Sequence, residues 1–176
     1  MIAEKSNVFY IHGLYGSSNS RKFNYIQAKH PNAICVEWKF NDNIDFYIEN
    51  TLSMLANTDG HITLIGSSAG GNFAWQIQQL LKKMDRICDL ILINPLLDLA
   101  YKYEDNFPNH LVKFIKPMDQ FINTTVLISS QDEILDTIKI QSFFQDYDKN
   151  NPNQVVIKMV ESDHRISNFD EVFPDL

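Results

Sequence analysis

A serine bracketed by glycines is the strongest chemical signal in this 176-residue sequence. An apolar, β-branched run at 62–65 leads directly into Gly66-Ser67-Ser68-Ala69-Gly70. Apolar side chains then recur at the spacing of one helix face: Phe73, Ile77, Leu80, Leu81 and Met84. A strand, a tight turn and a helix form the setting of a nucleophile elbow, whose small neighbouring residues let the serine oxygen stand out. We therefore predict that Ser68 is a nucleophile.

Other uses of a Gly/Ser-rich turn fit this segment less well. Such a turn could serve packing alone or cradle a phosphate. A dinucleotide-binding fingerprint needs glycine where Ser68 stands, and a P-loop needs Gly-Lys-Ser/Thr where the chain has Gly71-Asn72-Phe73. The pattern favours covalent chemistry at the serine.

A serine nucleophile needs a base and a group that orients the base. Asp132 follows the apolar run 125–130, and His164 follows the run 155–160, so both come directly after expected strands. The order Ser68, Asp132, His164 is the one used with this kind of elbow. His164 would take the Ser68 proton as general base, and Asp132 would hold the imidazole in the required tautomer.

Each of these two assignments has competitors. Glu133 and Asp136 lie beside Asp132, and the whole acidic segment could be only a solvated helix cap, a role that suits Asp136. Among the other histidines, His30 is expected to close a helix, His61 to open a strand, and His110 to lie between strands. None of these three follows a strand after the acid, so His164 is preferred.

The first expected strand also ends in a turn of interest, His12-Gly13-Leu14-Tyr15-Gly16. We expect the backbone N–H groups of Leu14 and Ala69 to form an oxyanion hole. We place His12, Tyr15 and Leu97 beside the substrate. The alternative is an ordinary glycine-rich loop in which His12 is a structural side chain.

Strand and helix patterns alternate along the whole chain, which predicts an α/β fold with a doubly wound parallel sheet. The chemistry then belongs at the carboxyl ends of the strands. Strands are expected at Val8–His12, Ala33–Trp38, Ile62–Ile65, Leu90–Asn94, Thr125–Ser130 and Val155–Val160. Helices are expected at Arg21–Lys29, Ile44–Ala56, Ala69–Met84, Leu111–Lys116 and Thr137–Tyr147.

Composition excludes several classes of protein. The net charge is −7, without a basic stripe, so nucleic acid is not an expected partner. We expect no membrane span, no signal peptide before the first strand, and no metal or other cofactor. The two cysteines, Cys35 and Cys88, lack any ligand spacing and fit reduced thiols in a cytoplasmic protein. We expect one domain over 1–176, as a monomer or homodimer.

The chain resembles the α/β-hydrolase superfamily, and within it the small bacterial YqiA/YcfP-type esterases. The matching segments are Tyr10-Ile11-His12-Gly13, Gly66–Gly71, Asn94-Pro95, Asp132–Asp136 and Asp163-His164. The resemblance implies a minimal hydrolase fold with six strands in the order 2-1-3-4-5-6 and helices on both faces. It also implies serine esterase or thioesterase activity without a cofactor. Gln131 and Arg165 depart from the family pattern, in which glycine precedes the acid and the histidine loop is less charged.

Residues 95–123 occupy the position of a lid in this superfamily and are rich in Phe, Tyr and Leu. An apolar lid would favour an acyl chain, but the same side chains could only cover the sheet. We expect hydrolysis of short-to-medium acyl esters through an acyl-enzyme. The alternatives are an acyl-CoA thioesterase and a hydrolase-fold protein that binds a ligand without turnover.

Overall fold

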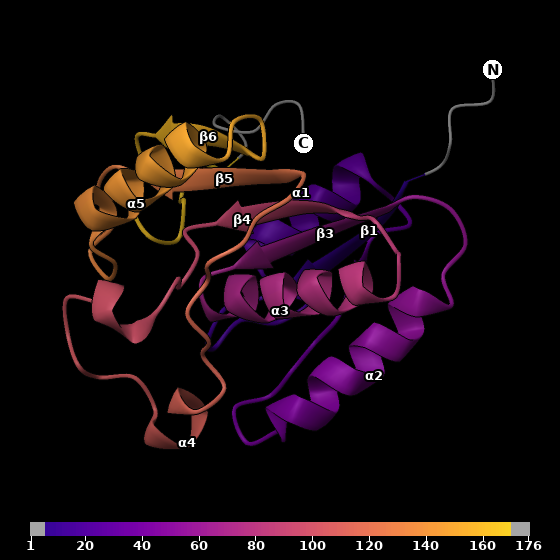
Figure 1. Ribbon diagram of the computed structural model, residues 1–176. Helices are drawn as coiled ribbons and strands as arrows, with labels where there is room; N and C mark the ends of the chain where they lie inside the picture. Colours follow the sequence, from indigo (N-terminus) through magenta and orange to yellow (C-terminus); the bar gives the residue numbers. More distant parts are fainter. Residues whose placement is uncertain (1–5, 170–176) are drawn as a thin grey trace.

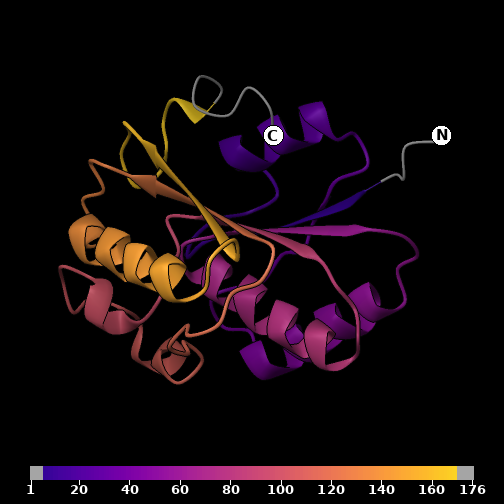
Figure 2. The ribbon, with the colours of Figure 1, turned by 45° about the horizontal axis from the view of Figure 1, so that its top comes forward.

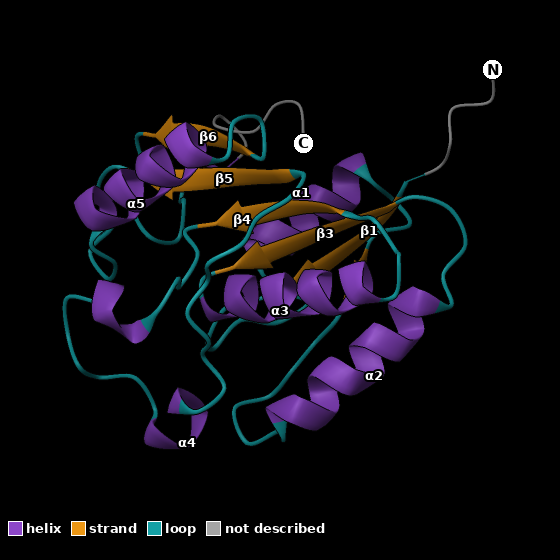
Figure 3. Cartoon of the chain, in the orientation of Figure 1, coloured by secondary structure: helices purple, strands orange, loops and turns teal. Residues whose placement is uncertain are grey.

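A six-stranded parallel sheet forms the centre of the computed structural model, which describes residues 6–169. Its strands are β1 (Asn7–Ile11), β2 (Ile34–Cys35), β3 (Ile62–Ser67), β4 (Asp89–Ile93), β5 (Thr124–Ser129) and β6 (Val155–Val160). The order β2-β1-β3-β4-β5-β6 confirms the expected topology, and every neighbouring pair is parallel. The arrowheads in Figure 3 point in one direction, so the carboxyl ends of the strands meet at one edge.

Helices cover both faces of this sheet, as a parallel sheet requires. They are α1 (Arg21–Lys29), α2 (Ile44–Ala56), α3 (Ala69–Lys83), α4 (Asn109–Val112) and α5 (Thr137–Asn150), with a 3₁₀ turn at Leu99–Tyr101. In Figure 1, α2, α3 and α5 lie in front of the sheet and α1 lies behind it; Figure 2 separates the two layers. Within residues 6–169, none of these helices combines the length and the apolar character needed to span a bilayer.

Two apolar cores hold the layers together, one on each face of the sheet. The larger core joins β1, β3, β4 and β5 to α2, α3 and α5, with fully buried Phe73, Leu55 and Phe144 from the three helices. The smaller core lies under α1, where Ile26 and Phe169 are also fully buried. Successive side chains of a strand point to opposite faces of the sheet, so Phe9 and Ile11 of β1 lie in the larger core and Val8 and Tyr10 lie in the smaller one.

Strand β2 is much shorter than the expected strand at 33–38. The chain leaves the sheet after Val36 because its polar groups find other partners. Trp38 donates its backbone N–H to His12 Nε2 at 3.3 Å and its indole N–H to the His12 carbonyl at 2.8 Å. The Tyr47 hydroxyl donates to the Val36 carbonyl at 2.8 Å.

Helix α4 is also shorter and earlier than the helix expected at 111–116. Pro108 precedes its first turn, and Pro117 follows soon after, so the helix pattern has no room to extend. Between them, Phe114 and Ile115 donate to carbonyls three residues back, which continues the chain as tight turns. Residues 1–5, where no signal peptide is expected, and residues 170–176 lie outside the described part of the chain.

Candidate active site

Ser68 stands at the turn between β3 and α3 with φ 53° and ψ −123°. A non-glycine residue in such a region costs on the order of 1–3 kcal/mol. The glycines beside it make the turn possible. A Cβ at Gly66 would lie 2.6 Å from the Gly71 Cα, and a Cβ at Gly70 would lie 2.5 Å from the Ile11 carbonyl. The Gly-x-Ser-x-Gly spacing is therefore a packing requirement of this turn.

The backbone of Ser68 is fixed to the end of β4. Its N–H donates to the Ile93 carbonyl at 3.0 Å, and its own carbonyl accepts from the Leu96 N–H at 3.1 Å. The same carbonyl accepts from Gly71 and Asn72 in the first turn of α3. The serine side chain is half-buried and lies at the N-terminus of a helix of 15 residues. The positive end of that helix dipole favours negative charge at this position.

Asp132 and His164 form a hydrogen-bonded pair at the same edge of the sheet. Asp132 Oδ2 lies 2.7 Å from His164 Nδ1, and their side chains are 1% and 11% exposed. Asp132 Oδ1 accepts from the backbone N–H groups of Ile134 and Leu135, each at 2.8 Å. With the carboxylate as acceptor, Nδ1 carries the imidazole proton and Nε2 keeps its lone pair.

The backbone of His164 is also held by side chains of other elements. Its N–H donates to Glu133 Oε2 at 3.0 Å, and its carbonyl accepts from Asn94 Nδ2 at 2.9 Å. Asn94 is buried at the end of β4 and also bonds to both the hydroxyl and the N–H of Ser129 at the end of β5. His164 is thus fixed through its N–H, its carbonyl and its ring.

Within residues 6–169, no hydrogen bond joins Ser68 Oγ to His164. Catalytic hydrogen bonds are often long before a substrate binds. Both residues are nevertheless attached to one short segment, 93–96. The backbone of this segment binds Ser68 on both sides, and the Asn94 side chain binds the His164 carbonyl. The positions of the hydroxyl and the imidazole therefore depend on the same four residues of the chain.

The two amides expected to form an oxyanion hole have no hydrogen-bond acceptor among residues 6–169. Ala69 is the first residue of α3, where N–H groups lack helical partners. Leu14 lies in a turn closed by a hydrogen bond from Gly16 to the Gly13 carbonyl at 2.9 Å. That turn contacts the elbow, since a Cβ at Gly13 would lie 3.1 Å from Ser68 Cβ.

The three residues expected beside the substrate lie in different surroundings. His12 is buried, with Nδ1 2.8 Å from the Gly13 carbonyl and Nε2 accepting from Trp38. Burial lowers the pKa of its imidazole. Leu97 is buried in the larger core. Tyr15 is 80% exposed and has a φ of 61°. It is the third residue (i+2) of the turn 13–16, and a turn with positive φ at this position usually has glycine there.

The competing histidines and carboxylates have structural partners of their own. His30 caps the end of α1, His61 Nε2 lies 2.8 Å from Asp89 at the start of β4, and His110 Nε2 lies 2.8 Å from the Phe40 carbonyl. Asp136 accepts from the Lys139 N–H and caps α5, as expected. In the part of the chain that the structure describes, no group of three His, Cys, Asp or Glu side chains forms a metal site.

Lys22 of α1 places a titratable positive charge in the field of Asp132 and Asp163. Burial lowers the pKa of Lys22 to about 8, although the negative charges of Asp163 and Asp132 act to raise it. α1 reaches the histidine loop through Arg21, which donates a hydrogen bond to the Ser167 carbonyl. A positive charge near Asp132 is therefore lost at moderately alkaline pH.

Sequence reasoning did not identify Asn94 or Glu133 as supports of His164. Asn94 directly follows an apolar strand, and Glu133 directly follows the expected acid. The sequence did offer one signal for Asn94, which is a polar residue at the carboxyl end of a strand. Its partner His164 lies 70 residues away, so no local pattern reports the contact.

Solved structures share this fold at low sequence identity. A YdeN-like hydrolase from Pectobacterium atrosepticum is 14% identical, with a TM-score of 0.63 over 93% of this chain and 82% of that one. A hyperthermophilic esterase from the archaeon Pyrobaculum calidifontis is 15% identical, with a TM-score of 0.63 over 98% and 72%. A structure described with LipS and LipT, two metagenome-derived lipolytic enzymes, is 13% identical, with a TM-score of 0.64 over 96% and 90%.

The chain therefore has the α/β-hydrolase fold. No protein-family model and no curated protein matches its sequence.

Proposed function

We propose that this protein is a serine hydrolase that cleaves short-to-medium acyl esters, with Ser68 as nucleophile, His164 as general base and Asp132 as the orienting acid. The observation that carries the proposal is the backbone of Ser68, φ 53° and ψ −123° at the head of α3. Strained backbone at a non-glycine residue is costly and tends to occur at functional sites, so this conformation supports a catalytic role for the serine.

In the proposed reaction, His164 transfers one proton in each of two rounds. His164 Nε2 takes the proton of the Ser68 hydroxyl as Oγ attacks the carbonyl carbon of the ester. The amides of Leu14 and Ala69 donate hydrogen bonds to the oxygen as it becomes negative. The imidazolium, stabilised by Asp132, then returns the proton to the departing alcohol oxygen, which leaves an acyl group on Ser68. Water deprotonated by His164 releases the acid in a second round of the same steps.

His12 has a different role in this proposal from the one the sequence suggested. Because both of its ring nitrogens bind backbone groups, we assign it to shaping the Leu14 turn and not to touching the substrate. We assign Leu97 to the core that supports the site. Tyr15 remains the expected substrate contact.

We infer that residues 95–123 act as a fixed cover over the sheet and α3. Side chains of α3 bind the carbonyls of this segment along its length. Asn72 Nδ2 donates to Leu96 and Lys116, and Gln76 Nε2 donates to Phe114, all within 2.9 Å. A lid that opened as a unit would break these buried and partly buried hydrogen bonds.

We further assign the chain to the small bacterial YqiA/YcfP-type esterases. The support is the order of their motifs along this chain, from Tyr10-Ile11-His12-Gly13 to Asp163-His164. The single-domain organisation over 1–176 belongs to the same proposal.

A fluorophosphonate probe tests the nucleophile because it labels only an activated serine. We expect labelling of the wild type and of Ser67→Ala, a matched change at the neighbouring buried serine, but not of Ser68→Ala. Equal labelling of all three proteins, or of none, contradicts the proposal. A panel of acyl esters against acyl-CoA thioesters then separates esterase from thioesterase activity.

A further inference from the structure

Three aromatic side chains from separate parts of the chain meet near the carboxyl edge of the sheet. Tyr15 stacks on Phe40 with ring centroids 5.7 Å apart and planes 13° from parallel. Phe40 meets the His110 ring edge to face at 4.5 Å, and its carbonyl binds His110 Nε2. We call Tyr15, Phe40 and His110 the aromatic wall. It joins the turn after β1, the loop before α2 and the helix α4.

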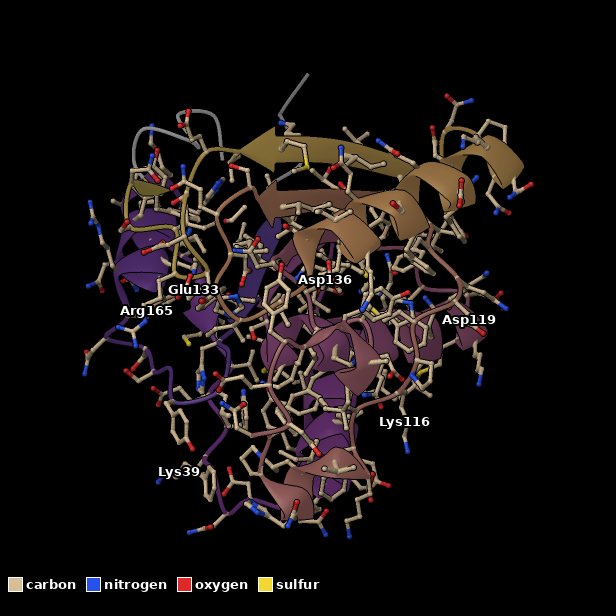
Figure 4. The ribbon with its side chains drawn as sticks, turned by 90° about the vertical axis from the view of Figure 1, so that its left-hand side faces the viewer. Lys39, Lys116, Asp119, Glu133, Asp136 and Arg165 are labelled. Carbon is tan, nitrogen blue, oxygen red and sulfur yellow. The ribbon has the colours of Figure 1, made fainter. Side chains whose placement is uncertain are left out.

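The aromatic wall starts beside the proposed nucleophile. Gly13, whose Cβ would lie 3.1 Å from Ser68 Cβ, is separated from Tyr15 by two Cα steps of about 3.8 Å each. Leu14, which carries one of the free amides, lies between them. Figure 4 views the molecule from the left-hand side of Figure 1. It shows Lys39, the neighbour of Phe40, on the same side of the molecule as Glu133 and Arg165, the neighbours of Asp132 and His164.

Neither packing nor backbone preference explains a tyrosine at position 15. Its side chain is 80% exposed, so it contributes little to the core. Its φ of 61° is one that glycine adopts at lower cost. One face of the ring rests on Phe40, which fixes its orientation. The remaining surface of the ring is left open, and Tyr15 directly follows Leu14, whose amide would bind the reacting carbonyl.

We propose that the open face of Tyr15 stacks on an aromatic ring carried by the ester, so that the preferred substrates are esters with an aromatic group close to the carbonyl. This inference rests on the proposed function, because it names the substrate class of the Ser68 site. Offset aromatic pairs are favoured beyond the area that they bury. The stack on Phe40, which itself packs against His110, restricts the orientation of Tyr15, so less of its freedom is lost when the ring binds.

Ester pairs that differ only in ring planarity test this proposal. The first pair is benzyl and cyclohexylmethyl acetate, with the ring in the alcohol. The second is methyl phenylacetate and methyl cyclohexylacetate, with the ring in the acid. After correction for alkaline hydrolysis rates, we expect kcat/KM to favour the planar ring by about threefold to tenfold in at least one pair. No preference in either pair overturns the proposal.

Variants assign the preference to Tyr15. We expect Tyr15→Phe to keep it and Tyr15→Leu to lose it. Tyr15→Gly should also lose it while unfolding at the same or a higher urea concentration, since glycine fits a φ of 61°. The control is Phe46→Leu, a change at another exposed aromatic residue, on α2. A preference that survives in Tyr15→Leu, or is lost in Phe46→Leu, contradicts the assignment.

A binding measurement separates this proposal from the proposed function. Benzyl alcohol and cyclohexylmethanol are titrated into Ser68→Ala while the Tyr15 ring protons, assigned with Tyr15→Leu, are followed by NMR. We expect benzyl alcohol to shift these resonances upfield and cyclohexylmethanol to leave them nearly unchanged. If no ester is hydrolysed but the shift occurs, the aromatic site stands and the hydrolase proposal fails. If esters are hydrolysed without a ring preference and no shift occurs, the hydrolase proposal stands and the aromatic site fails.

Discussion

The side-chain amide of Asn94 donates a hydrogen bond to the backbone carbonyl of His164 at 2.9 Å, across 70 residues of sequence. Asn94 is 2% exposed and has a φ of 43°, a conformation that asparagine tolerates better than most residues. Its position next to Ile93, which binds the Ser68 N–H, means that one segment at the end of β4, 93–96, supports both partners of the proposed proton transfer.

The Asn94–His164 contact predicts the effect of Asn94→Asp. The carboxylate can still accept from the Ser129 N–H, but it cannot donate to Ser129 Oγ or to the His164 carbonyl. We expect a loss of about 1–3 kcal/mol in the free energy of unfolding. Displacement of the imidazole should lower kcat/KM on the order of 10²-fold. Urea denaturation measures the free energy of unfolding, and ester hydrolysis measures kcat/KM.

The matched control is Gln78→Glu, the same chemical change at a buried amide. Gln78 donates to the carbonyls of Cys88 and Ile122, away from the histidine loop. It should lose similar stability with little change in kcat/KM. Equal losses of activity in the two variants would mean that Asn94 has no specific link to His164.

The acid is identified by comparing Asp132→Asn with Glu133→Gln. Asparagine at 132 can offer an N–H to His164 Nδ1, which selects the wrong tautomer, so kcat should fall by about 10⁴-fold. Glutamine at 133 keeps an oxygen that accepts the His164 N–H, so the expected loss is below about tenfold. Initial rates at saturating ester measure both. If Glu133→Gln costs as much as Asp132→Asn, the acid has been assigned to the wrong residue.

Local patterns were sufficient for much of this structure. The strands β1 and β3 to β6 and the helices α1, α2, α3 and α5 were predicted to within a few residues because their apolar patterns are strong. The order of the strands came from the family resemblance. The elbow was recognisable because steric limits at Gly66 and Gly70 leave a signature in the sequence itself.

Features that depend on distant partners were not predictable in the same way. β2 ends early because Trp38 binds His12, and no pattern within 33–38 reports that contact. The roles of Asn94 and Glu133 arise only when the loops after β4, β5 and β6 come together. The stack of Tyr15 on Phe40 likewise joins loops that are separate in the sequence.

The elbow predicts a large loss of stability for alanine at one of two adjacent glycines and little change at the other. In Gly70→Ala the new Cβ would lie against the backbone carbonyls of Ile11 and His12, which cannot move without disturbing the end of β1. We expect a loss of about 3 kcal/mol in the free energy of unfolding. In Gly71→Ala the nearest atom is 3.3 Å away, and alanine favours the helix by about 1 kcal/mol, so stability should change little. Urea denaturation of the two variants measures the difference, and equal stability would contradict this account of the turn.

Burial of His12 predicts how stability depends on pH. Burial lowers the pKa of the folded imidazole below its ordinary value. Above about pH 6.5 the ring is neutral in both states, and the stability is fully present. As the pH falls below that value, the unfolded chain binds a proton that the folded chain does not. The free energy of unfolding should therefore fall toward pH 5, with a slope of up to about 1.4 kcal/mol per pH unit from this residue.

Two variants isolate the His12 contribution in urea denaturation between pH 8 and pH 5. His12→Gln removes the titrating ring, so its curve should be flatter than that of the wild type even though it is less stable at pH 7. Trp38→Phe loses the indole donor to the His12 carbonyl but keeps the backbone N–H that binds Nε2. It should be less stable by a similar amount at every pH. If His12→Gln keeps the full pH dependence of the wild type, then other groups titrate in this range and the buried imidazole contributes nothing to it.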